Sequence, residues 1–133
     1  MNIICGYAFQ RCISIVKEIG EEMLESRIYV GLDDKDSHEQ PYDTEHYKTM
    51  LKTVCKEFNA PFSMQVIEGG YFHDDGSWVE ENSLLITLIG IPKKTVYRIA
   101  KELCTLFNQE SVMITGTSVI RFNVREYYDK YGN

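Results

Sequence analysis

The stretch that decides the fold is Val66–Ile86, which reads VIEGGYFHDDGSWVEENSLLI. The pair Asp75-Gly76 stands between two runs of strand-forming residues, and Asp-Gly in that setting is a strong signal for a β-hairpin. Apolar residues at the outer ends of both runs predict contact with a core. Tyrosine, histidine, tryptophan and acidic residues crowd the turn instead, so we expect a hairpin with a polar, aromatic tip.

Apolar spacing predicts the other elements along the chain. We expect an amphipathic helix over residues 3–24, strands over 27–32, 62–73, 78–89 and 112–115, helices over 43–58 and 92–107, and a bend at 115–117. After the bend, residues 119–124 either extend the last strand or fold back as a short fifth one. The expected domains are therefore an N-terminal helix within residues 1–26, a core of residues 27–125 and a polar tail of residues 126–133.

The order of the core elements is strand, helix, strand, strand, helix, strand. This order predicts the α+β class, specifically a ferredoxin-like β-α-β-β-α-β sheet with two packed helices and an added N-terminal helix. The strand order across that sheet would be four, one, three, two. Leu84 and Leu85 point to opposite faces of one strand, so both faces are apolar. We therefore expect the N-terminal helix or a second copy of the chain to cover the other face, which favours a homo-oligomer.

The composition bounds the partners. The 133 residues include 14 Lys and Arg against 20 Asp and Glu, a formal charge of −6 and a pI of about 5.0. This balance argues against direct nucleic-acid binding, where basic side chains supply most of the affinity. No secretory signal or span of transmembrane length is visible, so we expect a cytoplasmic protein without a membrane partner, in the host cytoplasm if a phage encodes it.

Metal and cofactor signals are weak. The four cysteines form no C-x-x-C pair, and Cys55 and Cys104 fall beside apolar helix stripes, where a free thiol behaves as a small hydrophobe. The loop after the first strand superficially resembles a calcium loop, but Glu39 stands where a sharp turn needs glycine. We expect neither a cofactor nor a metal site.

The predicted topology brings three separate segments to one end of the domain. There Glu81 and Glu110 would flank Gly31, on strands about 10 Å apart, leaving room for a ligand. The candidate ligand-binding residues are Tyr29, Asp33, Tyr71, His73, Trp78, Glu81, Gln109 and Glu110. The alternative is that residues 109–111 only cap a helix while Trp78 closes the edge of the core.

Several phrases resemble a family of small bacterial and phage proteins catalogued only as a domain of unknown function. They are Tyr29–Leu32, the Gly70-Tyr71 and Gly76-Ser77-Trp78 parts of the hairpin, Glu81 with Ser83–Ile86, and Phe107–Val112, which contains Asn-Gln-Glu-Ser-Val. Many phage members begin near the first strand with a phrase similar to Gly31–Asp36. The resemblance covers residues 27–124, and it implies the fold and a phage or bacterial source.

Three functions stay open. The first is a non-catalytic module that binds a small molecule or a host protein, a phage or bacterial accessory or counter-defence protein acting by sequestration or blocking. The second is a small enzyme using Glu81 or Glu110 as general acid or base, assisted by His38 or His73. The third is an acidic inhibitor that mimics nucleic acid. The chain carries no nucleophile elbow, P-loop or Gly-x-Gly-x-x-Gly pattern, which favours the first.

Overall fold

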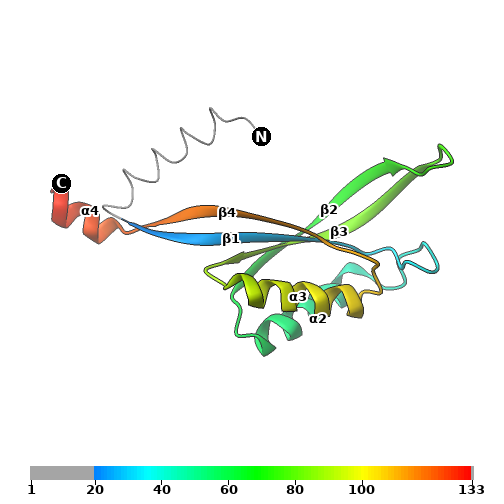
Figure 1. Cartoon of the computed structure of the whole chain (residues 1–133), viewed down its shortest axis with the longest axis horizontal. Coiled ribbons are helices and arrows are strands. Elements are labelled where there is room, and N and C mark those ends of the chain that lie inside the picture. The colour runs from blue at the N-terminus through cyan, green and yellow to red at the C-terminus, as the bar shows by residue number, and fades with distance from the viewer. Residues whose placement is uncertain (1–19, 133) are drawn as a thin grey trace. The chain divides into compact units, whose positions relative to one another are not determined.

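The computed structural model describes residues 20–132, and Figure 1 shows its elements in chain order. They are β1 (Gly20–Gly31), α2 (Thr44–Glu57), β2 (Phe62–Phe72), β3 (Trp78–Ile89), α3 (Lys93–Leu106), β4 (Met113–Phe122) and α4 (Val124–Tyr131). The chain divides into two compact units. One is Glu25–Gly116, and the other joins the segment ending at Leu24 to the segment beginning at Thr117. No helix among the described residues is both long and apolar enough to cross a membrane.

The four strands form one sheet in the order β2-β3-β1-β4, which is the predicted order. The β1–β3 and β2–β3 pairs are antiparallel, with Ile28 opposite Ile86 and Val66 opposite Leu84. This arrangement confirms the α+β class. It also confirms the hairpin, whose turn is closed by a hydrogen bond of 2.9 Å from the Gly76 N–H to the His73 carbonyl. Gly76 has a φ of 86°, a left-handed conformation that glycine adopts without strain.

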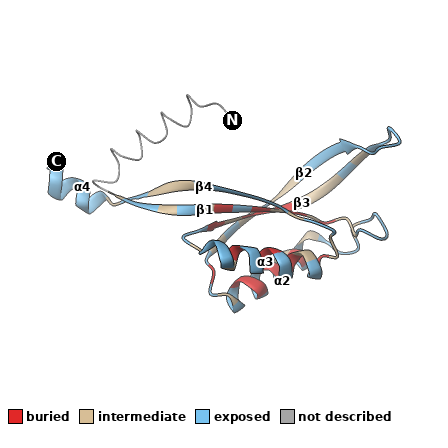
Figure 2. Ribbon diagram, in the orientation of Figure 1, coloured by how far each residue is buried: buried red, intermediate tan, exposed pale blue. Residues whose placement is uncertain are grey.

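The core of the unit Glu25–Gly116 lies between one face of the sheet and the two helices α2 and α3, which Figure 1 shows on the same side of the sheet. The most deeply buried members include Ile28, Val30, Leu51, Leu84, Ile86, Leu88, Ile99 and Leu103, each 0% exposed. Cys55 also lies in this core, and burial raises the pKa of its thiol to about 11. Figure 2 shows this burial confined to the helix layer and the middle of the sheet, while the hairpin end stays exposed.

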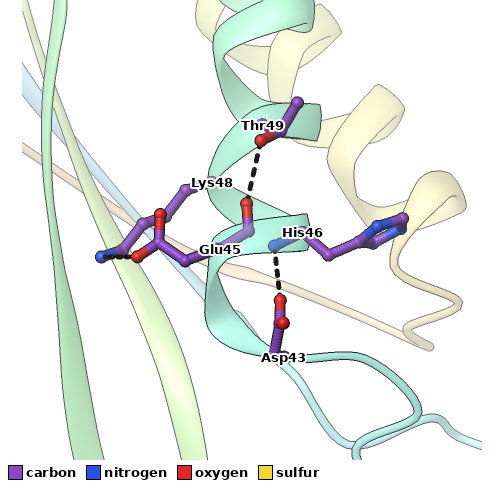
Figure 3. A network of polar contacts seen from close by, with 5 residues as sticks. All are labelled: Asp43, Glu45, His46, Lys48 and Thr49. Carbon is purple, nitrogen blue, oxygen red and sulfur yellow. Dashed lines mark hydrogen bonds and ion pairs between the residues drawn. The ribbon is translucent and has the colours of Figure 1, made fainter.

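Helix α2 begins where the sequence predicts. The Asp43 carboxylate accepts a hydrogen bond of 2.9 Å from the His46 N–H and so caps the helix (Figure 3). One turn further on, Glu45 forms an ion pair of 2.9 Å with Lys48, and the Thr49 hydroxyl donates to the Glu45 carbonyl. These contacts fix the start of α2, and therefore the length of the loop between β1 and α2.

Two predictions at the ends of strands are wrong. The expected helix over residues 3–24 is wrong for its last residues, because β1 begins at Gly20. A Cβ at Gly20 would meet the Arg121 carbonyl at 2.7 Å, so β4 approaches this stretch closely, and this approach of β4 outweighs the helical spacing of the apolar residues. The rest of that expected helix, residues 3–19, lies outside the described residues. The expected bend at residues 115–117 is absent, since β4 runs unbroken from Met113 to Phe122. The expected polar tail contains α4, capped by the Asn123 side chain.

The face of the sheet opposite α2 and α3 carries the alternate residues of each strand. On it Leu85 is buried and Ile89 is 45% exposed. No helix formed by residues 25–116 lies on this face. Its expected cover by the N-terminal helix or by a second copy therefore stays a prediction.

Two leucines of α3 provide a test of the core. Leu103→Ala leaves a cavity under the sheet, so we expect it to lower the free energy of unfolding by about 2–5 kcal/mol. Leu106, three residues further along α3, is 43% exposed, and Leu106→Ala should cost less than about 1 kcal/mol. Urea unfolding followed by circular dichroism measures both. Equal losses in the two variants would contradict the assigned face of α3.

Candidate functional site

A cavity of about 550 Å3 opens at the hairpin end of the unit Glu25–Gly116. Three segments line it: β1 with the loop after it, the tip half of the β2–β3 hairpin, and the turn between α3 and β4. The lining residues are Tyr29, Gly31, Asp33, Asp34, Lys35, His38, Tyr71, His73, Val79, Glu81, Ser83, Gln109, Glu110, Ser111, Val112 and Met113. Its strand residues alternate with core residues such as Val30 and Leu84, so the cavity lies on the sheet face opposite α2 and α3.

Seven of the eight candidate ligand-binding residues line this cavity. They are Tyr29, Asp33, Tyr71, His73, Glu81, Gln109 and Glu110. The convergence of three segments at one end, expected from the topology, is therefore present. Whether these side chains bind a ligand stays a prediction.

Trp78 is the exception. Trp78 and Glu80 are both an even number of positions from Leu84. Their side chains therefore lie on the face of β3 that carries Leu84, opposite to the face with the first cavity. There Trp78 lines a second cavity of about 490 Å3, its indole lies against Gly70 where a Cβ would collide with the ring, and its Nε1 donates a hydrogen bond of 3.0 Å to Glu80. Trp78 does not close the edge of the core, because the residue is 55% exposed, and whether it binds a ligand stays a prediction. The pairing of β2 with β3 continues without a break past Gly70. The strand therefore has no β-bulge there, and the glycine makes room for the indole ring.

Gly31 creates the space at the centre of the cavity. A Cβ at this position would lie 3.0 Å from a carboxylate oxygen of Glu81 and 3.2 Å from the side-chain carbonyl oxygen of Gln109. The sequence predicted Glu81 and Glu110 on the two sides of Gly31. Glu81 is confirmed, and Gln109 takes the other side because its amide turns inward and donates hydrogen bonds to the Asp33 carbonyl at 2.6 Å and the Phe107 carbonyl at 3.2 Å.

Two carboxylates share the inner wall. Burial raises the pKa of Glu81, the nearby Asp33 charge raises it further, and a hydrogen bond from the Asp33 backbone N–H opposes both effects. Burial also raises the pKa of Asp33, helped by Glu39 and opposed by His38. Burial makes the ionised form of each carboxylate less favourable. A cation between the two would be attracted by both and would stabilise their ionised forms.

Aromatic rings form the outer wall. The rings of His38 and His73 come from different segments and lie 6.5 Å apart, and Tyr71 lies 5.4 Å from His73, all in edge-to-face arrangements. Lys35 is the one lysine or arginine among the lining residues. The cavity therefore combines an acidic interior with an aromatic rim, which suits a ligand that carries both a positive charge and a planar ring.

Sequence reasoning missed part of the wall. Val79 and Ser83 line the cavity because they share the alternation of Glu81, and counting outward from Leu84 would have found them. Asp34, Lys35 and His38 belong to the loop after β1, which the predicted topology brings to this end of the domain, so topology rather than strand alternation places them in the wall. Within residues 20–132, no group of three histidine, cysteine, aspartate or glutamate side chains is arranged to hold a metal ion.

Neither a protein-family model nor a curated protein matches the chain. Among solved structures, it is similar to a phage SAM lyase in complex with S-methyl-5'-thioadenosine, with 27% identity, a TM-score of 0.53, and coverage of 76% of this chain and 90% of the lyase. The same comparison with a phage SAM lyase in its apo state gives 26% identity, a TM-score of 0.57, and coverage of 78% and 90%. The Bacillus subtilis GlnK–ATP complex, at 12% identity with a TM-score of 0.50 over 74% of this chain and 82% of GlnK, shares the fold.

Replacing Gly31 tests the centre of the cavity. In Gly31→Ala the new methyl group should push the Glu81 carboxylate toward solvent, because a side-chain end moves more easily than a paired strand. The pKa of Glu81, read from its carboxyl carbon by NMR titration, should then fall toward its ordinary value. Gly69→Ala is the control, since nothing lies within 4 Å of its new methyl group. An unchanged pKa of Glu81 in Gly31→Ala would contradict this geometry.

The raised pKa of Glu81 also predicts a pH dependence of stability. A carboxyl group whose pKa is higher in the folded state binds more protons there, so stability falls as the pH rises from 4.5, its ordinary pKa, through the folded value. Glu81→Gln removes this loss, while its amide oxygen can still accept from the Asp33 N–H. We expect the variant to be more stable than the original chain at pH 7, with the difference shrinking toward pH 4.5. Urea unfolding at both pH values measures it, and a constant difference would contradict the assignment.

Proposed function

We propose that this chain binds S-adenosylmethionine (SAM) in the cavity around Gly31 and cleaves it with release of S-methyl-5'-thioadenosine. The observation that carries the proposal is the acidic, aromatic cavity in a chain that is 26–27% identical to phage SAM lyase over 90% of the lyase's length. A cavity of about 550 Å3 falls within the usual range for small-molecule sites.

The charge of the inner wall fits this substrate. SAM carries a positive sulfonium sulfur, and Glu81 and Asp33 are carboxylates whose ionised forms a nearby cation would favour. S-methyl-5'-thioadenosine is a neutral thioether. Cleavage would therefore remove the electrostatic attraction, and the product would leave more easily than the substrate.

The rim of the cavity fits the adenine ring. Tyr71 is 44% exposed and meets His73 edge to face, so the tyrosine retains an accessible ring surface. Tyr29 lines the cavity from β1. Stacking of an adenine on such a ring adds binding free energy that does not depend on charge.

The bond changes of a lyase limit the mechanism. When the bond between the sulfonium sulfur and Cγ of the amino-acid chain breaks, its electron pair goes to sulfur and the thioether becomes neutral. No water is added, so the new bond at Cγ comes from the substrate itself. In one route the substrate carboxylate attacks Cγ and closes a lactone. In the other, a base takes a proton from Cβ, and the electron pair of that C–H bond forms a double bond between Cβ and Cγ. In the second route Glu81 is the candidate base, as in the acid–base alternative above.

A chain that destroys SAM would act by depleting a small molecule, which is one form of the phage counter-defence role expected from the sequence. Sequestration differs from cleavage only in turnover. We favour cleavage because the similar solved protein is a lyase.

Incubation of the purified full chain with SAM, followed by mass spectrometry, tests the proposal. We expect many equivalents of S-methyl-5'-thioadenosine per chain, and the co-product distinguishes a lactone from an unsaturated amino acid. Glu81→Gln should lower kcat/KM about 100-fold, because it removes a charged group from the inner wall. Glu102→Gln, on the exposed side of α3, is the matched control and should stay within about twofold.

Two results would contradict the proposal in different ways. Tight binding of SAM in calorimetry without any product would replace cleavage by sequestration. Neither binding nor product would remove SAM as the ligand altogether.

A further inference from the structure

Helices α2 and α3 end in the same way. Each has a phenylalanine as its C-cap, Phe58 or Phe107, and each phenylalanine is followed by an asparagine with positive φ, 52° at Asn59 and 48° at Asn108. Asparagine tolerates this left-handed conformation better than most residues, so both positions are explained by helix termination. Asn108 has a second set of contacts that helix termination does not require.

Those contacts join Asn108 to the loop after β1. Its side-chain amide nitrogen donates hydrogen bonds to Asp34 at 2.7 Å and to Asp36 at 2.9 Å. Its backbone carbonyl accepts a hydrogen bond of 3.1 Å from the Lys35 N–H. One residue of the α3–β4 turn thus contacts three consecutive residues of a loop more than 70 positions away in sequence.

Asp34 extends this contact through the loop. The oxygen that does not face Asn108 accepts from the backbone N–H groups of Asp36 and Ser37, at 2.8 and 3.0 Å. Its carbonyl accepts a hydrogen bond of 2.8 Å from the His38 N–H. Hydrogen bonds to Asn108, Ser37 and Asp36 lower the pKa of Asp34, so this carboxylate stays ionised and repels Asp36 unless the amide lies between them.

We propose that Asn108 is a positioning residue of the cavity, holding the loop of residues 33–38 so that Asp33 and His38 form its wall. The inference rests on the proposed function for its effect on SAM. Asp33 is the link to the chemistry, because its N–H bonds to the Glu81 carboxylate while its carbonyl accepts from Gln109. Without Asn108, the Asp34 and Asp36 charges would separate and draw the loop away from Glu81.

The residue type is restricted by two requirements. Glycine would keep the left-handed backbone but lose the donor, and aspartate would keep the shape but add a third carboxylate to two existing ones. Asparagine satisfies both the backbone and the charge. Asn108→Gly therefore removes the hydrogen-bond donor, whereas Asn108→Asp adds a negative charge, and we expect both variants to release the loop of residues 33–38.

The matched control is Asn59→Gly, which makes the same change at the end of α2. In Asn108→Gly we expect the amide hydrogens of Asp36, Ser37 and His38 to exchange at least tenfold faster, measured by NMR on the full chain. The KM for SAM should rise about tenfold. Asn108→Asp should show both effects at least as strongly, and Asn59→Gly should leave the exchange of these amides and the KM within about twofold.

A double-mutant cycle separates positioning from general stability. Asp36→Ala removes one of the two hydrogen bonds that the Asn108 side chain donates, at an exposed position of the loop, and leaves α3 unchanged. If Asn108 acts through this loop, Asn108→Gly and Asp36→Ala should be non-additive in KM. Should Asn108→Gly fail to fold, Asp36→Ala alone must still speed the exchange of Ser37 and His38 at least threefold, and no change there would overturn the inference.

Three other results would also overturn it: unchanged amide exchange in Asn108→Gly, equal exchange effects in Asn108→Gly and Asn59→Gly, or faster exchange with an unchanged KM. If the original chain neither binds nor cleaves SAM, the proposed function fails separately. The amide exchange of the loop then still decides whether Asn108 holds residues 33–38.

Discussion

The pairing of β1 with β3 is the constraint on which the rest of the structure depends. With Ile28 opposite Ile86 and Val30 opposite Leu84, every second residue of both strands faces α2 and α3. The residues between them necessarily face the other side, where the cavity lies. A slip of one residue would exchange the two sets and bring polar residues such as Ser83 and Thr87 to the core positions of Leu84, Ile86 and Leu88, at a cost in desolvation. Core and cavity are therefore two consequences of one register.

The same register explains why the cavity contains partly buried carboxylates whose ionised form is unfavourable. β1 ends at Gly31, and the missing side chain leaves a space that Glu81 and Gln109 enter from opposite sides. Burial removes water from both Glu81 and Asp33 and raises the pKa of each carboxyl group. No lysine or arginine is among the groups that lower either pKa. Burial of a carboxylate without a cation costs stability, and such sites are typical of positions kept for binding or catalysis.

Much of the fold could be predicted from the sequence because its signals are local. Asp75-Gly76 determines the hairpin, Asp43 the start of α2, and the apolar stripe of α3 its buried face. The ends of the sheet could not be predicted in the same way. The residues from Gly20 to Leu24 have spacing compatible with a helix, and only the close approach of β4, distant in sequence, makes them a strand.

The site was predictable where strand alternation decides it and not where a hydrogen bond decides it. Glu81 lies two positions before Ser83, so strand alternation places both side chains on the cavity face. The same alternation places Trp78 on the opposite face. The choice of Gln109 over Glu110 beside Gly31 depends on a bond to the Asp33 carbonyl, which no spacing encodes. The hairpin end, where the cavity opens, is exposed in Figure 2, so apolar packing alone cannot hold its loops. Hydrogen bonds from the α3–β4 turn supply that order, and this explains why an asparagine and a glutamine follow the last buried phenylalanine.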